Sequence, residues 1–197
     1  IHWIKYRCYR FLLLCAVRRV SHIIAVSYGV KKDVIHYLKV PEKKISVIYE
    51  GVDDYSLSTK RDTHILSKYP AKEYALYVGN SYPHKNVEGL IKLFTEFQKK
   101  FGSNFLLFLC GQEDFFTKRI RDVITQRGLE GAIIHLGCVS DNELHALYAH
   151  ARFFITCSYE EGFGLPPLEA QQRGVPVIVP NWSVFPEILG NSALYID

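Results

Sequence analysis

The sequence predicts an α/β protein built on a doubly wound, Rossmann-like parallel sheet with helices on both faces. Three observations carry this prediction. Short runs rich in β-branched and aliphatic residues recur along the chain, and each is followed by a helical pattern. Most of these runs are apolar throughout, as expected of strands that helices cover on both faces. The composition is that of a globular protein, with 48% hydrophobic and 22% charged residues among 197.

The predicted elements follow one another in regular alternation. Strands are expected at 23–27, 45–50, 74–79, 104–110, 133–137, 152–158, 176–180 and 193–196. Helical patterns lie between them, near 30–38, 86–101, 114–127, 141–150 and 166–173. This order predicts that consecutive strands are parallel and joined by helical crossovers.

The first twenty residues form a further helical pattern. Its apolar run, Phe11 to Val17, is too short to span a bilayer and is bracketed by Arg10 and Arg18. A buried amphipathic helix is one interpretation. The other is an interfacial helix that places its arginines at anionic lipid head groups: Arg7, Arg10, Arg18 and Arg19.

A polar, poorly periodic stretch that includes Pro70 interrupts the alternation between Asp53 and Lys72. We therefore expect a remnant of a first domain at 1–53, a linker at 54–72 and a second domain at 73–197. The chain contains no methionine and opens on Ile1 within an apolar pattern, so we expect a fragment whose natural start lies upstream.

Composition and spacing disfavour several classes of function. The five cysteines include no CxxC pair, which excludes the usual zinc spacings, makes a disulfide framework improbable and favours a reducing compartment. The net charge of +4 comes without a dense basic face, so nucleic acid is not an expected partner. The histidines are dispersed, and no metal site is expected. Neither a P-loop nor a complete G-x-G-x-x-G occurs, so nucleotide hydrolysis and hydride transfer lose support.

The strongest chemical signal lies between two predicted strands, in the segment 158–179, which reads SYEEGFGLPPLEAQQRGVPVIV. Gly162 and Gly164 permit a tight turn, and the two prolines that follow can open a helix. A strand, a glycine loop and a helix start form an anion site at the carboxyl edge of a parallel sheet. Glu161 and Glu169 would flank that site. The alternative is an ordinary turn with two surface carboxylates.

The stretch E-G-F-G-L-P-P-L-E at 161–169 resembles the two-glutamate signature of group-1 retaining glycosyltransferases with the GT-B fold. Four further segments resemble motifs of that family in the same order: 27–38, 45–53, 77–86 and 174–197. The sequences P-H-K-N and E-G-F-G-L-P-P-L-E-A are most similar to those of the bacterial mannosyltransferase-like branch. The resemblance implies that the second domain binds the donor and that the first-domain remnant belongs to the acceptor side.

The resemblance also implies roles for individual residues. Lys85 would neutralise the donor diphosphate, Glu161 would hold hydroxyls of the donor sugar, and Glu169 would accept hydrogen bonds from the ribose. Lys85 and Glu161 are thus the expected catalytic groups. The remaining donor-binding positions would be Gly79, Asn80, Gly111, Cys138, Val139, Gly162, Phe163, Gly164 and Leu165. Of these, Gly111 would let the ligand pass close to the backbone, and Cys138 and Val139 would lie beside the base.

This chain departs from the family pattern at three places. Asn80 stands where the family often has an arginine, which leaves more of the phosphate charge to Lys85. Glu50 replaces a usual asparagine, and polar residues at 171–173 replace smaller or apolar ones.

The implied activity is transfer of a hexose, with mannose favoured, from a GDP- or UDP-sugar to a glycan or lipid-linked acceptor with retention. Such chemistry belongs to polysaccharide or lipopolysaccharide biosynthesis, in the cytoplasm or peripherally on the inner face of the membrane, and needs no metal or other cofactor. A GT-B epimerase or phosphorylase and a non-catalytic sugar-nucleotide-binding module are the alternatives. Because most of the acceptor domain is absent, we expect this fragment alone to be inactive.

Overall fold

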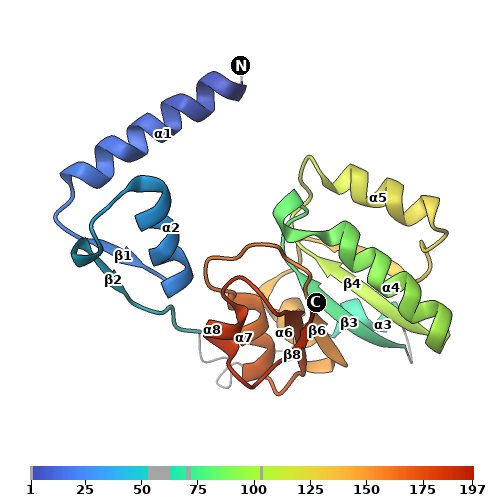
Figure 1. Ribbon diagram of the computed structural model, residues 1–197. Coiled ribbons are helices and arrows are strands. Elements are labelled where there is room, and N and C mark those ends of the chain that lie inside the picture. Colours follow the sequence, from blue (N-terminus) through green and yellow to red (C-terminus); the bar gives the residue numbers. More distant parts are fainter. Residues whose placement is uncertain (1, 53–62, 70–71, 103) are drawn as a thin grey trace. The chain divides into compact units, whose positions relative to one another are not determined.

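The computed structural model describes residues 2–52, 63–69, 72–102 and 104–197 (Figure 1). The chain divides into two compact units, residues 1–51 and 52–197. Residues 54–62 and 70–71 of the expected linker lie outside the described residues. Its described part includes the short helix α3 (His64–Ser67), whose Ile65 is buried in the core of the second unit.

The first unit is a small βαβ arrangement preceded by a long helix. In chain order it comprises α1 (His2–Arg19), β1 (Ile23–Ala25), α2 (Tyr28–Leu38), the 3₁₀ turn η1 (Glu42–Lys44) and β2 (Ile45–Val47). β1 and β2 pair in parallel around a core of Ala25, Val40 and Ile45. The Ser27 hydroxyl accepts a hydrogen bond from the Val30 amide and so caps α2, which begins directly after it.

Helix α1 forms as its pattern indicates, but most of its apolar side chains are not covered by the described chain. Trp3, Tyr6 and Phe11 remain 67%, 61% and 65% exposed. Only its C-terminal part reaches the core of the first unit, through Val17. The burial expected of this helix is therefore not found within the described residues. Across those residues, no helix combines the length and hydropathy needed to cross a bilayer.

The second unit contains one six-stranded parallel sheet. Its strands are β3 (Glu73–Val78), β4 (Phe105–Cys110), β5 (Ile133–Gly137), β6 (Phe153–Ile155), β7 (Val177–Pro180) and β8 (Leu194–Ile196). Their order across the sheet is β5-β4-β3-β6-β7-β8, and every neighbouring pair is parallel. Strands β4 and β5 are added on one side of β3, and strands β6, β7 and β8 are added on its other side. The order of addition therefore switches sides at β3. All eight predicted strands are present in the two units.

Helices cover both faces of this sheet, which confirms the predicted doubly wound fold. One face packs against α4 (Val87–Phe101) and α5 (Thr117–Gln126), which lie side by side in Figure 1. The other face packs against α3, α6 (Asp141–His150), α7 (Leu165–Gln172) and α8 (Phe185–Leu189). Along β3, Tyr74 and Leu76 face one core while Ala75 and Tyr77 face the other. Because both faces are buried, the strands are apolar at consecutive positions.

Because the six strands are parallel, the loops that follow them leave the sheet at the same edge. Local hydrogen bonds shape these loops. Helix α5 begins at Thr117, later than predicted, with Phe116 as its N-cap residue. In the turn before it, the Asp114 carboxylate accepts from the amides of Phe116 and Thr117. This carboxyl edge is where the predicted site residues belong.

Candidate functional site

Lys85 and Glu161 meet at the carboxyl edge of the sheet, although 76 residues separate them in sequence. The Lys85 ammonium donates to both carboxylate oxygens of Glu161, at 2.8 Å each. Their side chains are 19% and 18% exposed, so the pair is largely shielded from solvent. The geometry thus joins two of the residues singled out in the sequence into one charged unit.

The turn that carries Lys85 is fixed to the strand beside it. Lys85 ends a 3₁₀ turn, η3 (Pro83–Lys85), and Asn86 follows in the left-handed conformation with φ of 50°. The Asn86 side chain accepts from the Gly89 amide, which caps α4, and donates to the Cys157 carbonyl just after β6. The Tyr159 amide also donates to the His84 carbonyl. The loops after β3 and β6 are therefore tied together on both sides of Lys85.

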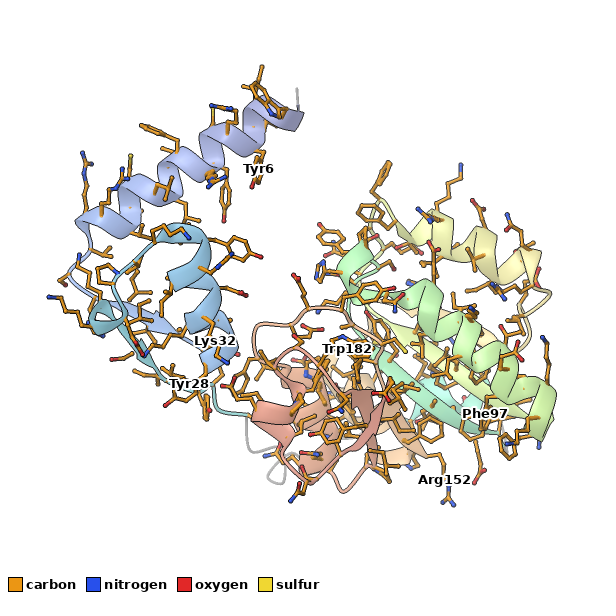
Figure 2. The ribbon with its side chains drawn as sticks, viewed as in Figure 1. Tyr6, Tyr28, Lys32, Phe97, Arg152 and Trp182 are labelled. Carbon is orange, nitrogen blue, oxygen red and sulfur yellow. The ribbon has the colours of Figure 1, made fainter. Side chains whose placement is uncertain are left out.

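Glu161 is held from the loop that follows β7. Its amide donates to the Ser183 hydroxyl at 3.0 Å, and Ser183 itself adopts a left-handed φ of 61°. The neighbouring Trp182, labelled in Figure 2, donates from its indole nitrogen to the Ser158 carbonyl. Three loops thus converge on the Lys85–Glu161 pair, those after β3, β6 and β7. Neither Trp182 nor Ser183 was among the predicted site residues.

Helix α7 begins at Leu165, about one helical turn of sequence after Glu161. Gly164 precedes the helix with φ of +96°, a conformation that a residue with a Cβ rarely adopts, which explains the glycine. Pro166 and Pro167 occupy the first turn and have no N–H group. Amide donors at this helix end can therefore come only from the turn before the prolines, which includes Gly164 and Leu165.

Glu169 lies in α7, and its carboxylate has a defined protein partner. The Tyr148 hydroxyl from α6 donates to Glu169 Oε2 at 2.8 Å. Glu161 lies in the loop before the helix, and Glu169 lies within it. Tyr148 was not among the predicted residues.

The other predicted positions lie at the ends of neighbouring strands. Gly79 and Asn80 follow β3, and the Asn80 carbonyl accepts from the buried Tyr77 hydroxyl. Gly111 follows β4, and a Cβ there would lie 2.0 Å from the Gly79 carbonyl oxygen. The close approach at Gly111 is thus to the chain's own backbone. Cys138 is exposed after β5, and Val139 packs partly against the core.

The pKa of the buried Tyr77 is affected by charged groups of the site. Burial raises the pKa of its hydroxyl far above the ordinary value, and the negative charges of Glu161 and Asp114 raise the pKa further. Tyr77 therefore stays protonated and donates its hydrogen bond to Asn80.

The arrangement can bind an anion that also carries hydroxyl groups. One ammonium, backbone amides before a helix and two carboxylates are the groups available at this edge. In the described ranges, no set of three or more His, Cys, Asp or Glu side chains is placed to hold a metal ion.

Two family models match the chain. The model described as glycosyl transferases group 1 matches residues 58–194, and the model described as glycosyltransferase family 4 matches residues 1–55. The change from one model to the other falls near the division between the two structural units at 51 and 52.

Curated relatives cover nearly all of the chain. The O-antigen chain mannosyltransferase RfbU of Salmonella typhimurium is 38% identical over 191 residues, which span 96% of this chain and 50% of that protein. The O-antigen chain mannosyltransferase B of Escherichia coli is 32% identical over 89% of this chain and 47% of its own length. The chain therefore spans about half the length of these relatives.

Solved structures show the same fold at lower identity. A glycosyltransferase from Rickettsia africae ESF-5 superposes with a TM-score of 0.76 at 24% identity, covering 90% of this chain and 49% of that one. Anabaena Alr3699/HepE, crystallised with UDP-glucose, gives a TM-score of 0.79 at 21% identity, covering 92% and 51%. At these identities the likeness concerns the fold, which is the GT-B type.

Proposed function

Because the chain belongs to the group 1 glycosyltransferase family, we propose that it forms the donor-binding part of a retaining mannosyltransferase. The donor is a nucleoside-diphosphate sugar, GDP- or UDP-linked, and the acceptor is a growing glycan or a lipid-linked saccharide. The observation that carries the proposal is the Lys85–Glu161 pair beside the start of α7. The names of the relatives support mannose and O-antigen-type polysaccharide biosynthesis. Nucleotide sugars bound to structural neighbours support the donor class.

In the proposed chemistry, the two residues of the pair contact different parts of the donor: Lys85 contacts the diphosphate and Glu161 contacts the sugar. Lys85 and the amides of Gly164 and Leu165 stabilise the negative charge that develops on the leaving diphosphate. Glu161 accepts hydrogen bonds from sugar hydroxyls and fixes the anomeric carbon relative to the diphosphate. The bond from that carbon to the phosphate oxygen breaks, the acceptor oxygen forms the new bond on the same face, and the acceptor proton leaves with the diphosphate. In this scheme the lysine and helix start supply the positive charge, and no metal ion takes part.

A thermal-shift panel on the full-length protein tests the donor assignment. We expect one of GDP, UDP or ADP, and its sugar conjugate, to raise the melting temperature. Lys85→Ala removes the charge-assisted contact and should weaken binding about ten- to a hundredfold. Glu169→Ala should also reduce the shift.

Matched controls lie in an exposed ion pair on α4. Lys99 and Glu96 are 67% and 63% exposed and contact each other at 2.8 Å. Lys99→Ala and Glu96→Ala remove the same chemical groups at a distance from the carboxyl edge and should leave the ligand shift intact. An unchanged shift in both Lys85→Ala and Glu169→Ala would exclude this site.

A peripheral membrane contact is proposed for α1. Its exposed Trp3, Tyr6 and Phe11 alternate with arginines, and the Arg7 guanidinium lies 4.7 Å from the Trp3 ring centre. Exposed aromatics with basic residues suit the head-group region of an anionic bilayer. A peptide of residues 1–20 should co-sediment with anionic vesicles and be released by salt. Failure to co-sediment would remove the support for this contact.

A further inference from the structure

Tyr148 places a hydroxyl group against the carboxylate of Glu169 from inside the protein. Its side chain is 0% exposed, yet its hydroxyl reaches Glu169 Oε2 at 2.8 Å and lies 3.3 Å from the Pro166 carbonyl oxygen. A buried hydroxyl that lacked a partner would be costly, so this contact is strongly favoured. It connects the core of the second unit to the helix that carries the second glutamate of the signature.

The ring of Tyr148 is itself held in place. It stacks on Phe154 of β6, with ring centres 6.3 Å apart and planes inclined by 28°. The Arg173 guanidinium lies 4.8 Å from the Tyr148 ring centre and also donates to the Glu169 carbonyl at 2.7 Å. The hydroxyl therefore has little freedom to follow Glu169 if that side chain moves.

The Tyr148 hydroxyl is the donor in its contact with Glu169. Burial raises the pKa of Tyr148 well above its ordinary value, and the charge of Glu169 raises the pKa further. The carboxylate can accept about four hydrogen bonds, so one bond from Tyr148 leaves capacity for a vicinal pair of hydroxyls. Because the hydrogen bond already restricts the Glu169 side chain, less side-chain entropy is lost when Glu169 binds a ligand.

We propose that Tyr148 is a positioning residue that orients the Glu169 carboxylate so that it recognises the ribose hydroxyls of the donor. The inference rests on the proposed function, because it assumes a ribonucleotide donor at this site. It adds a specificity determinant: the protein prefers ribonucleotides over deoxyribonucleotides through a buried tyrosine that does not itself contact the ligand.

The test compares ribose and deoxyribose ligands in the full-length protein. The probes are the nucleoside diphosphate that binds best and its 2′-deoxy analogue, measured by calorimetry. Tyr148→Phe removes one oxygen atom and should weaken binding of the ribonucleotide about tenfold while changing the deoxy analogue less than about twofold. The preference for ribose should therefore largely disappear.

The matched control is Tyr74→Phe. The Tyr74 hydroxyl is also buried and donates to the Leu147 carbonyl of the same helix, α6, at 2.7 Å, but it does not touch Glu169. This variant should lower stability and keep the ribose preference. A Tyr148→Phe protein that folds and retains the wild-type preference would reduce Tyr148 to a structural contact between helices and overturn the inference.

A second variant covers the case in which Tyr148→Phe does not fold. Glu169→Gln keeps the size of the side chain and removes the charge, and it should also lose most of the ribose preference. Retention of the preference in Glu169→Gln overturns the inference. A wild-type protein that binds no nucleoside diphosphate refutes the proposed function, whereas equal binding of ribose and deoxyribose forms refutes only the role of Tyr148.

Discussion

Gly111 shows how closely β4 and β3 pack at the edge that carries the site. A methyl group on this residue would lie 2.0 Å from the Gly79 oxygen and 2.8 Å from the Gly79 carbonyl carbon. These atoms belong to the backbone directly after the central strand β3, so they cannot rotate away as a side chain would. The packing of the chain's own backbone therefore requires a glycine at this position.

We therefore expect Gly111→Ala to lower the free energy of unfolding by about 3 kcal/mol, the upper range for overpacking. Urea unfolding of the chain measures the change. Gly131→Ala is the matched control, because a Cβ at Gly131 meets no atom within 4 Å. It should change stability by less than about 0.5 kcal/mol. Equal stability of the two variants would show that the strands can separate at this point.

His135 on β5 is a half-buried titratable group outside the site. Among the described residues, its Nδ1 is buried without a hydrogen-bond partner. Burial lowers the pKa of its imidazole below the ordinary 6.5, and the charge of Arg121 lowers it further, while Glu113 and Asp114 act in the opposite direction. The folded protein therefore binds this proton less readily than the unfolded chain does.

The sign of the pH dependence follows from this depressed pKa. The stability contributed by neutral His135 is fully present above pH 6.5 and is lost as the pH falls below that value, because the unfolded chain takes up the proton first. His135→Leu should flatten this part of the stability profile, measured by urea unfolding across the same pH range. Replacing the exposed His84 with alanine should leave the slope unchanged. If His135→Leu and wild type show the same slope, another group is responsible.

Individual site residues could be predicted only where a motif marked them. Lys85 and Glu161 were selected from the sequence, and the structure places their charged atoms in contact. Their contact could not be predicted, because it depends on how three loops meet. Tyr148, Trp182 and Ser183 gave no signal, since a buried tyrosine, a loop tryptophan and a loop serine have many ordinary roles. A rule that buried hydroxyls need partners would have drawn attention to Tyr148 only after the fold was known.

At the scale of elements, the sequence predicted strands and long helices well. All eight strands appear near their expected places, because continuous apolar runs are the strongest signal of a doubly covered sheet. The short helices α3 and α8 were not predicted, since four or five residues are too few to show a helical period. Helix α1 was recognised, but its exposure depends on which other parts of the protein lie against it.

Helix α6, which carries Tyr148, is started by a reciprocal cap. The Ser140 hydroxyl accepts from the Glu143 amide, and the Glu143 carboxylate accepts from the Ser140 amide. Ser140→Ala should therefore lower the free energy of unfolding by about 1 kcal/mol, measured by urea unfolding. Ser67→Ala removes an exposed hydroxyl that donates to the His64 carbonyl and should cost less than about 0.5 kcal/mol. A smaller effect at Ser140 than at Ser67 would contradict the role of this cap.

At the scale of the whole molecule, the chain joins two units that match two different family models. It spans about half the length of its curated relatives, and its described site contains groups suited to a donor. Sequence motifs mark the proposed donor residues because these residues fall in two short segments, the turn at Lys85 and the stretch from Glu161 to Glu169. Acceptor recognition has no comparable marker in these 197 residues.

We accordingly expect the 197-residue chain to transfer no sugar by itself. The assay would supply GDP-mannose or UDP-glucose with a simple saccharide acceptor and follow the product by mass spectrometry. The full-length protein, tested in parallel with a lipid-linked glycan, should form product under the same conditions. Turnover by the isolated chain would show that these 197 residues already contain a complete active site.

The contact between Lys85 and Glu161 also affects which anions the protein can select. In the free protein the carboxylate acts as a tethered competitor for the ammonium, at the high effective concentration that an intramolecular partner has. Inorganic phosphate offers negative charge to Lys85 but no sugar, so it would leave Glu161 without sugar hydroxyls to replace the contact it gives up. A sugar nucleotide offers an anion to one residue and hydroxyl groups to the other. In the proposed function, the internal ion pair therefore lowers the affinity for small phosphates more than it lowers the affinity for a sugar nucleotide.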